Sequence, residues 1–196
     1  GLDAGNRRMA EKVTEDMYRW SDGGRLPIIA DASSCTLGLV HEIVDHLDDE
    51  HKAMHARLTI TDAMTWLLET VVPDLPAHAK EKVAVIHPTC SMNTLGIAGD
   101  LERLSREVAE TVIVPVTATC CATAGDRGFL HPELTEHATL EEMEEVHAAG
   151  ADLFLSGNRT CELGLEHDSG EPYESVVIAL ERLTRPSQPA AGKRPR

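Results

Sequence analysis

The chain has 196 residues, of which 42% are hydrophobic and 3% aromatic, and its 33 acidic residues against 18 Lys and Arg give a formal net charge of −15. This charge argues against nucleic acid and anionic lipid as partners, because both bind through clustered Lys and Arg. The scarcity of aromatic side chains likewise argues against a stacking surface for single-stranded nucleic acid. We therefore expect partners that are neutral or basic.

Five cysteines occur without a recognisable export signal, and no stretch approaches the roughly 20 apolar residues of a membrane span. This usage predicts a reducing, cytoplasmic compartment. A disulfide between the adjacent Cys120 and Cys121 would be strained, so free thiols or metal ligands are favoured over a disulfide framework. The sequence starts at Gly1 without a Met, and we expect it to be a piece of a longer polypeptide.

Short apolar strands alternate with helical patterns along the chain. The expected elements are a strand at 26–30, a helix at 36–47, a strand at 57–60, a helix from Asp62 to Val71, a strand at 82–86, a helix at 93–107, a strand at 111–116, a polar connection at 117–133, a helix at 139–148, a strand at 152–155 and a helix at 173–183. This alternation predicts the α/β class, with parallel sheets flanked by helices.

The same pattern suggests how the chain is organised. We expect two pseudo-repeated, Rossmann-like halves, preceded by a helix or linker and followed by a disordered tail. The predicted bounds are 1–25 for the helix or linker, 26–80 for the first half, 81–185 for the second half and 186–196 for the tail.

One motif recurs three times: a strand, a short loop, a hydroxyl residue, a Cys, and then Leu-Gly followed by an apolar residue. It contains Cys35, Cys90 and Cys161, each at a predicted helix N-terminus, while Cys120 and Cys121 lie in the loop after the strand at 111–116. The functional crevice of an open parallel sheet lies beyond the carboxyl ends of its strands. All five cysteines are therefore predicted to share one rim of the sheet.

This placement suits a soft metal. A helix N-terminus lowers the pKa of a thiol, and thiolates select iron–sulfur clusters, zinc or Cu(I). The short Cys-x-x-Cys knuckle of common zinc sites is absent, and so is the usual ferredoxin run. The spacing alone leaves three hypotheses open: an iron–sulfur centre, a structural zinc site, or a thiol–disulfide module that uses Cys120 and Cys121.

Other candidate residues carry less weight. His87, three residues before Cys90, is interpreted as a packed or turn-stabilising residue, with a ligand or hydrogen-bond donor to sulfur as the alternative. His51 and His55, spaced by four, are interpreted as surface residues. The sequence contains neither a Gly-x-Gly-x-x-Gly nor a P-loop motif, and no nucleophile–base–orienter set is visible. We expect no catalytic residues and no nucleotide site in this piece.

Three runs carry a resemblance to a known family. They are His87-Pro88-Thr89-Cys90-Ser91, Cys120-Cys121-Ala122-Thr123-Ala124-Gly125-Asp126-Arg127-Gly128, and Asn158-Arg159-Thr160-Cys161-Glu162-Leu163-Gly164. Together they resemble the cysteine-rich CCG domain of heterodisulfide reductases and of FAD-linked D-lactate, glycolate and D-2-hydroxyglutarate dehydrogenases. The likeness is closer to the flavin dehydrogenases, through Asp31–Thr36 and Gly128–Thr135, and covers about residues 27–184.

The resemblance implies two Rossmann-like halves that meet at a [4Fe–4S] cluster of cubane or non-cubane type, which an isolated domain can lose. The implied ligands are Cys90, Cys120, Cys121 and Cys161, completed by Cys35 from the first half. Two positions depart from the family pattern: Ala122 replaces the Gly of the CCG motif, and a terminal Cys-x-x-Cys is reduced to Cys161.

The resemblance also implies a role. The chain would be the electron-transfer domain of a larger FAD-linked D-2-hydroxyacid dehydrogenase, with FAD held elsewhere in the full-length protein. The implied partners are FAD-binding and ferredoxin-like domains of the same polypeptide or complex, and a quinone-side electron acceptor. Such an acceptor places the protein in the cytoplasm, peripheral to the inner face of the membrane.

Overall fold

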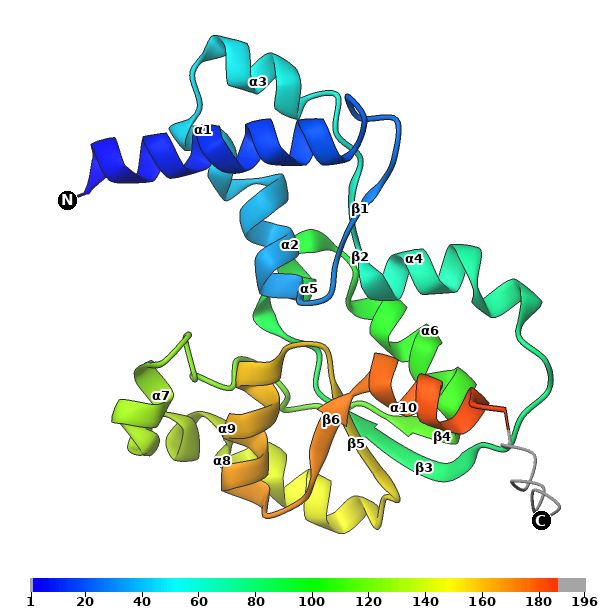
Figure 1. Cartoon of the computed structure of the whole chain (residues 1–196). Coiled ribbons are helices and arrows are strands. Elements are labelled where there is room, and N and C mark those ends of the chain that lie inside the picture. The colour runs from blue at the N-terminus through cyan, green and yellow to red at the C-terminus, as the bar shows by residue number, and fades with distance from the viewer. Residues whose placement is uncertain (1, 187–196) are drawn as a thin grey trace, which may run out of the picture.

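The computed structural model describes residues 2–186; from Ser187 onward, the tail predicted to be disordered lies outside them. Within the described residues the strands form two parallel sheets with helices packed against them, so the predicted α/β class is confirmed. One sheet has two strands in the order β1-β2, and the other has four strands in the order β4-β3-β5-β6. Figure 1 shows the two-stranded sheet between α1, α3 and the larger sheet.

The first part of the chain builds the two-stranded sheet and the helices around it. Its elements are α1 (Asp3–Trp20), β1 (Ile28–Ala30), α2 (Ser33–Val40), the 3-10 helix η1 (Glu42–His46), α3 (Asp49–His55), β2 (Ile60–Asp62), α4 (Ala63–Thr70) and the 3-10 helix η2 (Val72–Asp74).

The second part builds the four-stranded sheet. Its elements are β3 (Glu81–Ile86), α5 (Cys90–Leu95), α6 (Ala98–Val108), β4 (Ala109–Ile113), α7 (Arg127–Leu130), α8 (Pro132–Ala149), β5 (Leu153–Ser156), α9 (Arg159–Ser169), β6 (Tyr173–Ser175) and α10 (Val176–Thr184).

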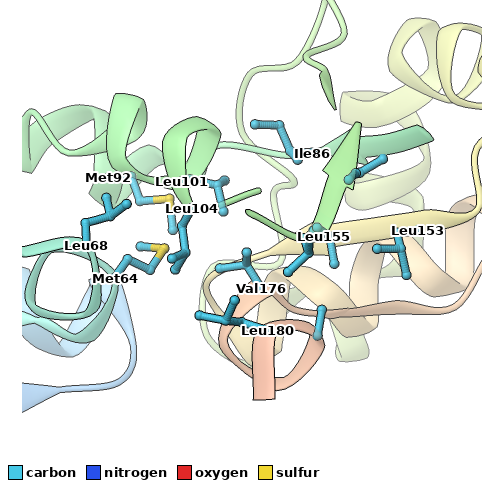
Figure 2. Packing of buried hydrophobic residues seen from close by; sticks show 14 residues of the cluster. Met64, Leu68, Ile86, Met92, Leu101, Leu104, Leu153, Leu155, Val176 and Leu180 are labelled. Carbon is cyan, nitrogen blue, oxygen red and sulfur yellow. The ribbon is translucent and has the colours of Figure 1, made fainter. Parts of the chain in front are cut away.

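Two apolar cores cover the two faces of the larger sheet. Successive side chains of a strand point to opposite faces, so Ile86 of β3 packs with residues of α4, α6 and α10, whereas Val85 packs with residues of α8 and α9. Figure 2 shows the first of these cores, in which Met64 and Leu68 of α4 join Leu101 of α6. Because α4 shares this core, the division of the chain at residue 80 stays a prediction.

A strand–helix–strand–helix unit occurs twice, which supports the pseudo-repeat predicted from sequence. β1 pairs in parallel with β2 as β5 pairs with β6, and in both pairs a helix starts directly after the second strand. The last strand residue caps that helix, because Asp62 accepts from the Met64 N–H and Ser175 from the Val177 N–H. The predicted N-cap role of Asp62 is thus confirmed, and both α4 and α10 pack against α6.

Some bounds differ from the sequence-based expectation. The helix predicted at 93–107 is two helices, because Gly96 ends α5 in the left-handed region with φ +74°. The helix predicted at 36–47 ends at Val40 and continues as η1. The helix predicted at 173–183 is preceded by the strand Tyr173–Ser175, which pairs with β5.

Among the helices of residues 2–186, none combines the length and the apolar character needed to span a bilayer.

Candidate metal centre

The cysteine positions predicted from the repeated motif are confirmed. Cys90 is the first residue of α5, while Cys35 and Cys161 lie in the first turns of α2 and α9. Cys120 and Cys121 lie in the loop between β4 and α7. Because β3, β4 and β5 are parallel, the segments that follow them emerge from the same edge of the sheet. All five thiols are free; Cys121 and Cys161 are buried and the other three are exposed.

Four of the five sulfurs interact with one another. A hydrogen bond from the Cys161 thiol is the largest cause that lowers the pKa of Cys121 from 9.0 to about 6. The pKa of Cys161 is correspondingly raised, first by this bond to Cys121 and then by burial. Burial also raises the pKa of Cys120, and the nearby thiols of Cys90 and Cys121 add to that rise. Such mutual effects require close approach, so the structure brings Cys90, Cys120, Cys121 and Cys161 together.

Polar groups surround these sulfurs. The backbone N–H of Ala122 donates to Cys120 Sγ at 3.4 Å, and the Thr123 hydroxyl donates to Cys121 Sγ at 3.3 Å. The side-chain amide of Asn158 lies 3.9 Å from Cys161 Sγ as a donor. Hydrogen bonds of this kind stabilise thiolates and tune the potential of a metal cluster.

The loop after Cys121 has an unusual backbone that explains a departure from the family motif. Ala122 and Ala124 adopt φ of +54° and +45°, in the left-handed region where a Cβ atom is unfavourable. A Gly at position 122, as in the CCG motif, would adopt this conformation freely. Ala122 therefore preserves the shape of the motif at a cost in backbone strain.

A cluster of buried hydroxyl groups joins α2 to α5. Ser33 Oγ hydrogen-bonds with Thr89 Oγ1 at 2.9 Å and with Ser91 Oγ at 2.7 Å, and all three residues are buried. Figure 1 shows α2 directly against α5. The cluster fixes the first turn of α2 beside the first turn of α5, which carries Cys90.

Cys35 follows this turn and is exposed. Its neighbour Ser34 donates to Asn158 Oδ1 at 3.2 Å, and Asn158 also contacts Cys161. The helix turn that carries Cys35 is therefore at the same rim as the other cysteines. The participation of the Cys35 sulfur itself stays a prediction.

His87 is part of a buried ion-pair arrangement. Its side chain is fully buried, and Nδ1 lies 2.7 Å from Oε1 of Glu142, a residue of α8 that is 2% exposed. His87 also lowers the pKa of Cys121. The structure therefore agrees with a packed histidine, but places it beside the cysteine cluster and gives it a carboxylate partner.

Glu142 escaped the sequence analysis because it lies in the acidic run Glu141–Glu145, which resembles a solvated helix face. Helical spacing was the available signal: Thr139, Met143 and Val146 are buried on the same face of α8 as Glu142. A lone carboxylate on such a face is costly unless it is paired.

A cavity of about 230 Å³ lies next to the cysteine loop, lined by Thr123, Gly128, Phe129, Pro132, Thr135, Leu163, Gly164 and His167. Two of its glycines permit close approach of the loop to α9. A Cβ atom at Gly128 would lie 2.8 Å from Thr123 Cα, and one at Gly164 would lie 2.4 Å from Thr123 Oγ1. The Gly of the third Leu-Gly motif therefore has a packing role at the site.

A second polar group lies far from the cysteines in sequence. One donor atom each from Glu11, Asp48 and His51 lie within 4.8 Å of one another. His51 Nδ1 is 2.7 Å from Asp48 Oδ1, and this bond is the main cause that raises the pKa of His51. His55 Nε2 lies 2.8 Å from the Leu39 carbonyl oxygen. Both histidines are half-buried and connect elements of the first unit, so the interpretation as surface residues is wrong.

The donor set of the cysteine centre fits a soft metal group: four neighbouring thiols, hydrogen-bond donors to three sulfurs, and a buried imidazole. Comparison with known proteins agrees. A family model described as a cysteine-rich domain, CCG, matches residues 84–166.

Two curated relatives are the C-type subunits of anaerobic glycerol-3-phosphate dehydrogenase from Escherichia coli strain K12 and from Escherichia coli O157:H7. Each is 23% identical over 157 residues, which cover 79% of this chain and 40% of the relative. The chain thus spans less than half the length of these relatives. Residues 84–166, with Cys90, Cys120, Cys121 and Cys161, form a cysteine-rich domain of the CCG family.

Proposed function

We propose that the chain is the iron–sulfur electron-transfer domain of a larger, FAD-linked dehydrogenase. The observation that carries the proposal is the convergence of Cys90, Cys120, Cys121 and Cys161, with mutual effects on their thiol pKa values. These cysteines are the proposed ligands, with Cys35 as a further candidate. The relationship to one subunit of a dehydrogenase supports a redox role.

The surroundings of the sulfurs suit electron transfer. A bound [4Fe–4S] cluster, cubane or non-cubane, would store and release single electrons. Buried Cys121 and Cys161 would hold its inner side away from water, while exposed Cys90 and Cys120 would lie on the side open to a partner. The donors from Ala122, Thr123 and Asn158 are placed to stabilise the ligating sulfurs.

We further propose a D-2-hydroxyacid as the substrate class of the whole protein. Support comes from the runs Asp31–Thr36 and Gly128–Thr135, which resemble the D-lactate, glycolate and D-2-hydroxyglutarate dehydrogenases. FAD bound in another part would take a hydride equivalent from the substrate, and this domain would pass electrons singly to a quinone-side acceptor. The proposal includes a cytoplasmic protein at the inner face of the membrane.

Anaerobic reconstitution of the chain with iron and sulfide tests the proposal. We expect a brown protein with about four iron and four sulfide per chain, as a [4Fe–4S] cluster requires. Cys121→Ser should lose most of the iron, because it removes a buried ligand. The matched variant Ser34→Ala, which lies at the same rim but offers no ligand, should keep it. A protein that stays colourless and metal-free after reconstitution would contradict the assignment.

Two other functions use the same thiols. A structural zinc site would give one tightly held zinc without iron, and chelation would lower stability. A thiol–disulfide module is favoured by one observation, the pKa of about 6 at Cys121, since a thiolate is the reactive form. Metal analysis identifies the first, and mass mapping of bridges after mild oxidation identifies the second.

A further inference from the structure

His87 and Glu142 form a pair that packing alone does not explain. The imidazole follows β3 and the carboxylate comes from α8, and neither side chain reaches solvent. A buried carboxylate and imidazole cost free energy that apolar residues at the same positions would avoid. The 2.7 Å contact between His87 Nδ1 and Glu142 Oε1 offsets part of that cost.

The second ring nitrogen is left over. Nε2 of His87 is buried and has no hydrogen-bond partner among the residues that the structure describes. Buried polar atoms without a partner are rare in folded proteins, and leaving one costs about 1–3 kcal/mol. The ring lies close enough to Cys121 to lower the pKa of its thiol, so this unpartnered atom belongs to a side chain beside the cysteine cluster.

The carboxylate determines what Nε2 can do. An ionised carboxylate only accepts hydrogen bonds, so Nδ1 carries the proton and neutral Nε2 presents a lone pair. This is the arrangement of a metal-binding histidine, whose other ring N–H is usually held by a carboxylate. Imidazole is a good ligand for iron, and histidine replaces cysteine in one class of iron–sulfur centre.

We propose that His87 Nε2 is a nitrogen ligand of the metal group held by Cys90, Cys120, Cys121 and Cys161, and that Glu142 keeps the ring in the ligating tautomer. The inference deepens the proposed function and rests on it. It also accounts for a ligand set in which the family's terminal Cys-x-x-Cys is reduced to Cys161. Glu142 is then a positioning residue, since it acts through His87.

Pulsed electron paramagnetic resonance of the reconstituted, reduced protein tests this assignment directly. Protein labelled with ¹⁵N at histidine should show the strong nitrogen coupling of a coordinated imidazole, and His87→Gln should lose it. His87→Cys should retain iron without the nitrogen coupling and with a lower reduction potential, because histidine ligation raises the potential of iron–sulfur centres.

The role of Glu142 is tested separately by metal retention. Glu142→Gln should keep the fold and lower metal affinity about 10- to 100-fold, the usual effect of removing the partner of a ligating histidine. Glu144→Gln, an exposed neighbour on α8, is the matched control and should change nothing.

The wild-type spectrum decides the question without any variant. Full iron content with no nitrogen coupling overturns the ligand role of His87 and leaves the proposed function intact. A chain that takes up no iron under reconstitution overturns both.

Discussion

Gly164 in the first half of α9 lies directly beneath the hydroxyl of Thr123, where a Cβ atom would be 2.4 Å from Oγ1. That hydroxyl donates to Cys121 Sγ at 3.3 Å. The packing of one helix glycine is therefore linked to a proposed ligand through a single threonine side chain. The same motif position in the first unit is Gly38, where a Cβ atom would meet only Glu42 Oε2 at 3.7 Å.

This difference makes Gly38 the matched control for Gly164. Gly164→Ala should displace Thr123, destabilise the fold by about 1–3 kcal/mol as overpacking does, and lower iron content. Gly38→Ala should be neutral or stabilise the fold by up to about 1 kcal/mol, because Ala favours a helix over Gly. Urea unfolding and iron analysis measure both effects. Equal destabilisation by the two changes would contradict the packing argument.

The strained loop makes a prediction of opposite sign. Ala122→Gly should stabilise the protein by about 1 kcal/mol, because it removes the penalty of a Cβ atom at φ +54°. Ala148→Gly, at an exposed position inside α8, should destabilise it by a similar amount. The two variants, compared by urea unfolding, separate the backbone conformation from the general effect of glycine. A loss of stability in Ala122→Gly would show that the loop does not hold this conformation.

The Cys121–Cys161 pair predicts how the stability of the reduced, metal-free protein depends on pH. Cys121 ionises near pH 6 in the folded state and near 9.0 when unfolded, so between these values the unfolded state binds more protons and stability rises with pH. Above pH 9 the unfolded state ionises Cys161 as well, whereas the folded state keeps that thiol protonated, so stability falls.

Anaerobic urea unfolding across pH 5 to 10 should therefore give a maximum near pH 9, lost progressively as pH falls toward 6. Cys161→Ala removes the thiol that stabilises the Cys121 thiolate and should flatten the rise between pH 6 and 9. Thiolate absorbance in the ultraviolet gives an independent titration of the folded protein. An unchanged rise in the variant would mean that Cys161 does not donate to Cys121.

Local sequence grammar was sufficient for the cysteine positions but not for their partners. Cys35, Cys90 and Cys161 could be placed because a short strand, a turn and a helix start are each encoded within a few residues. Glu142 could not, because its role depends on His87, 55 positions away in the chain. The strand Tyr173–Ser175 was missed for the same reason, since three residues gain strand geometry only by pairing with β5.

The buried hydroxyl cluster yields a last prediction about how the two units are held together. Ser33 bonds with both Thr89 and Ser91, so Ser33→Ala leaves two buried hydroxyl groups with fewer partners and should cost about 1–3 kcal/mol. Ser34→Ala removes only an exposed bond to Asn158 and should cost less than about 0.5 kcal/mol.

A double-mutant cycle of Ser33→Ala and Ser91→Ala isolates the link between α2 and α5. Residues in direct contact couple by about 0.5–3 kcal/mol, and we expect a coupling within that range from urea unfolding of the four proteins. Because the turn held by Ser33 carries Cys35, the Ser33 variant should also let a thiol reagent modify Cys35 faster. Additive effects together with an unchanged modification rate would mean that the cluster does not position this turn.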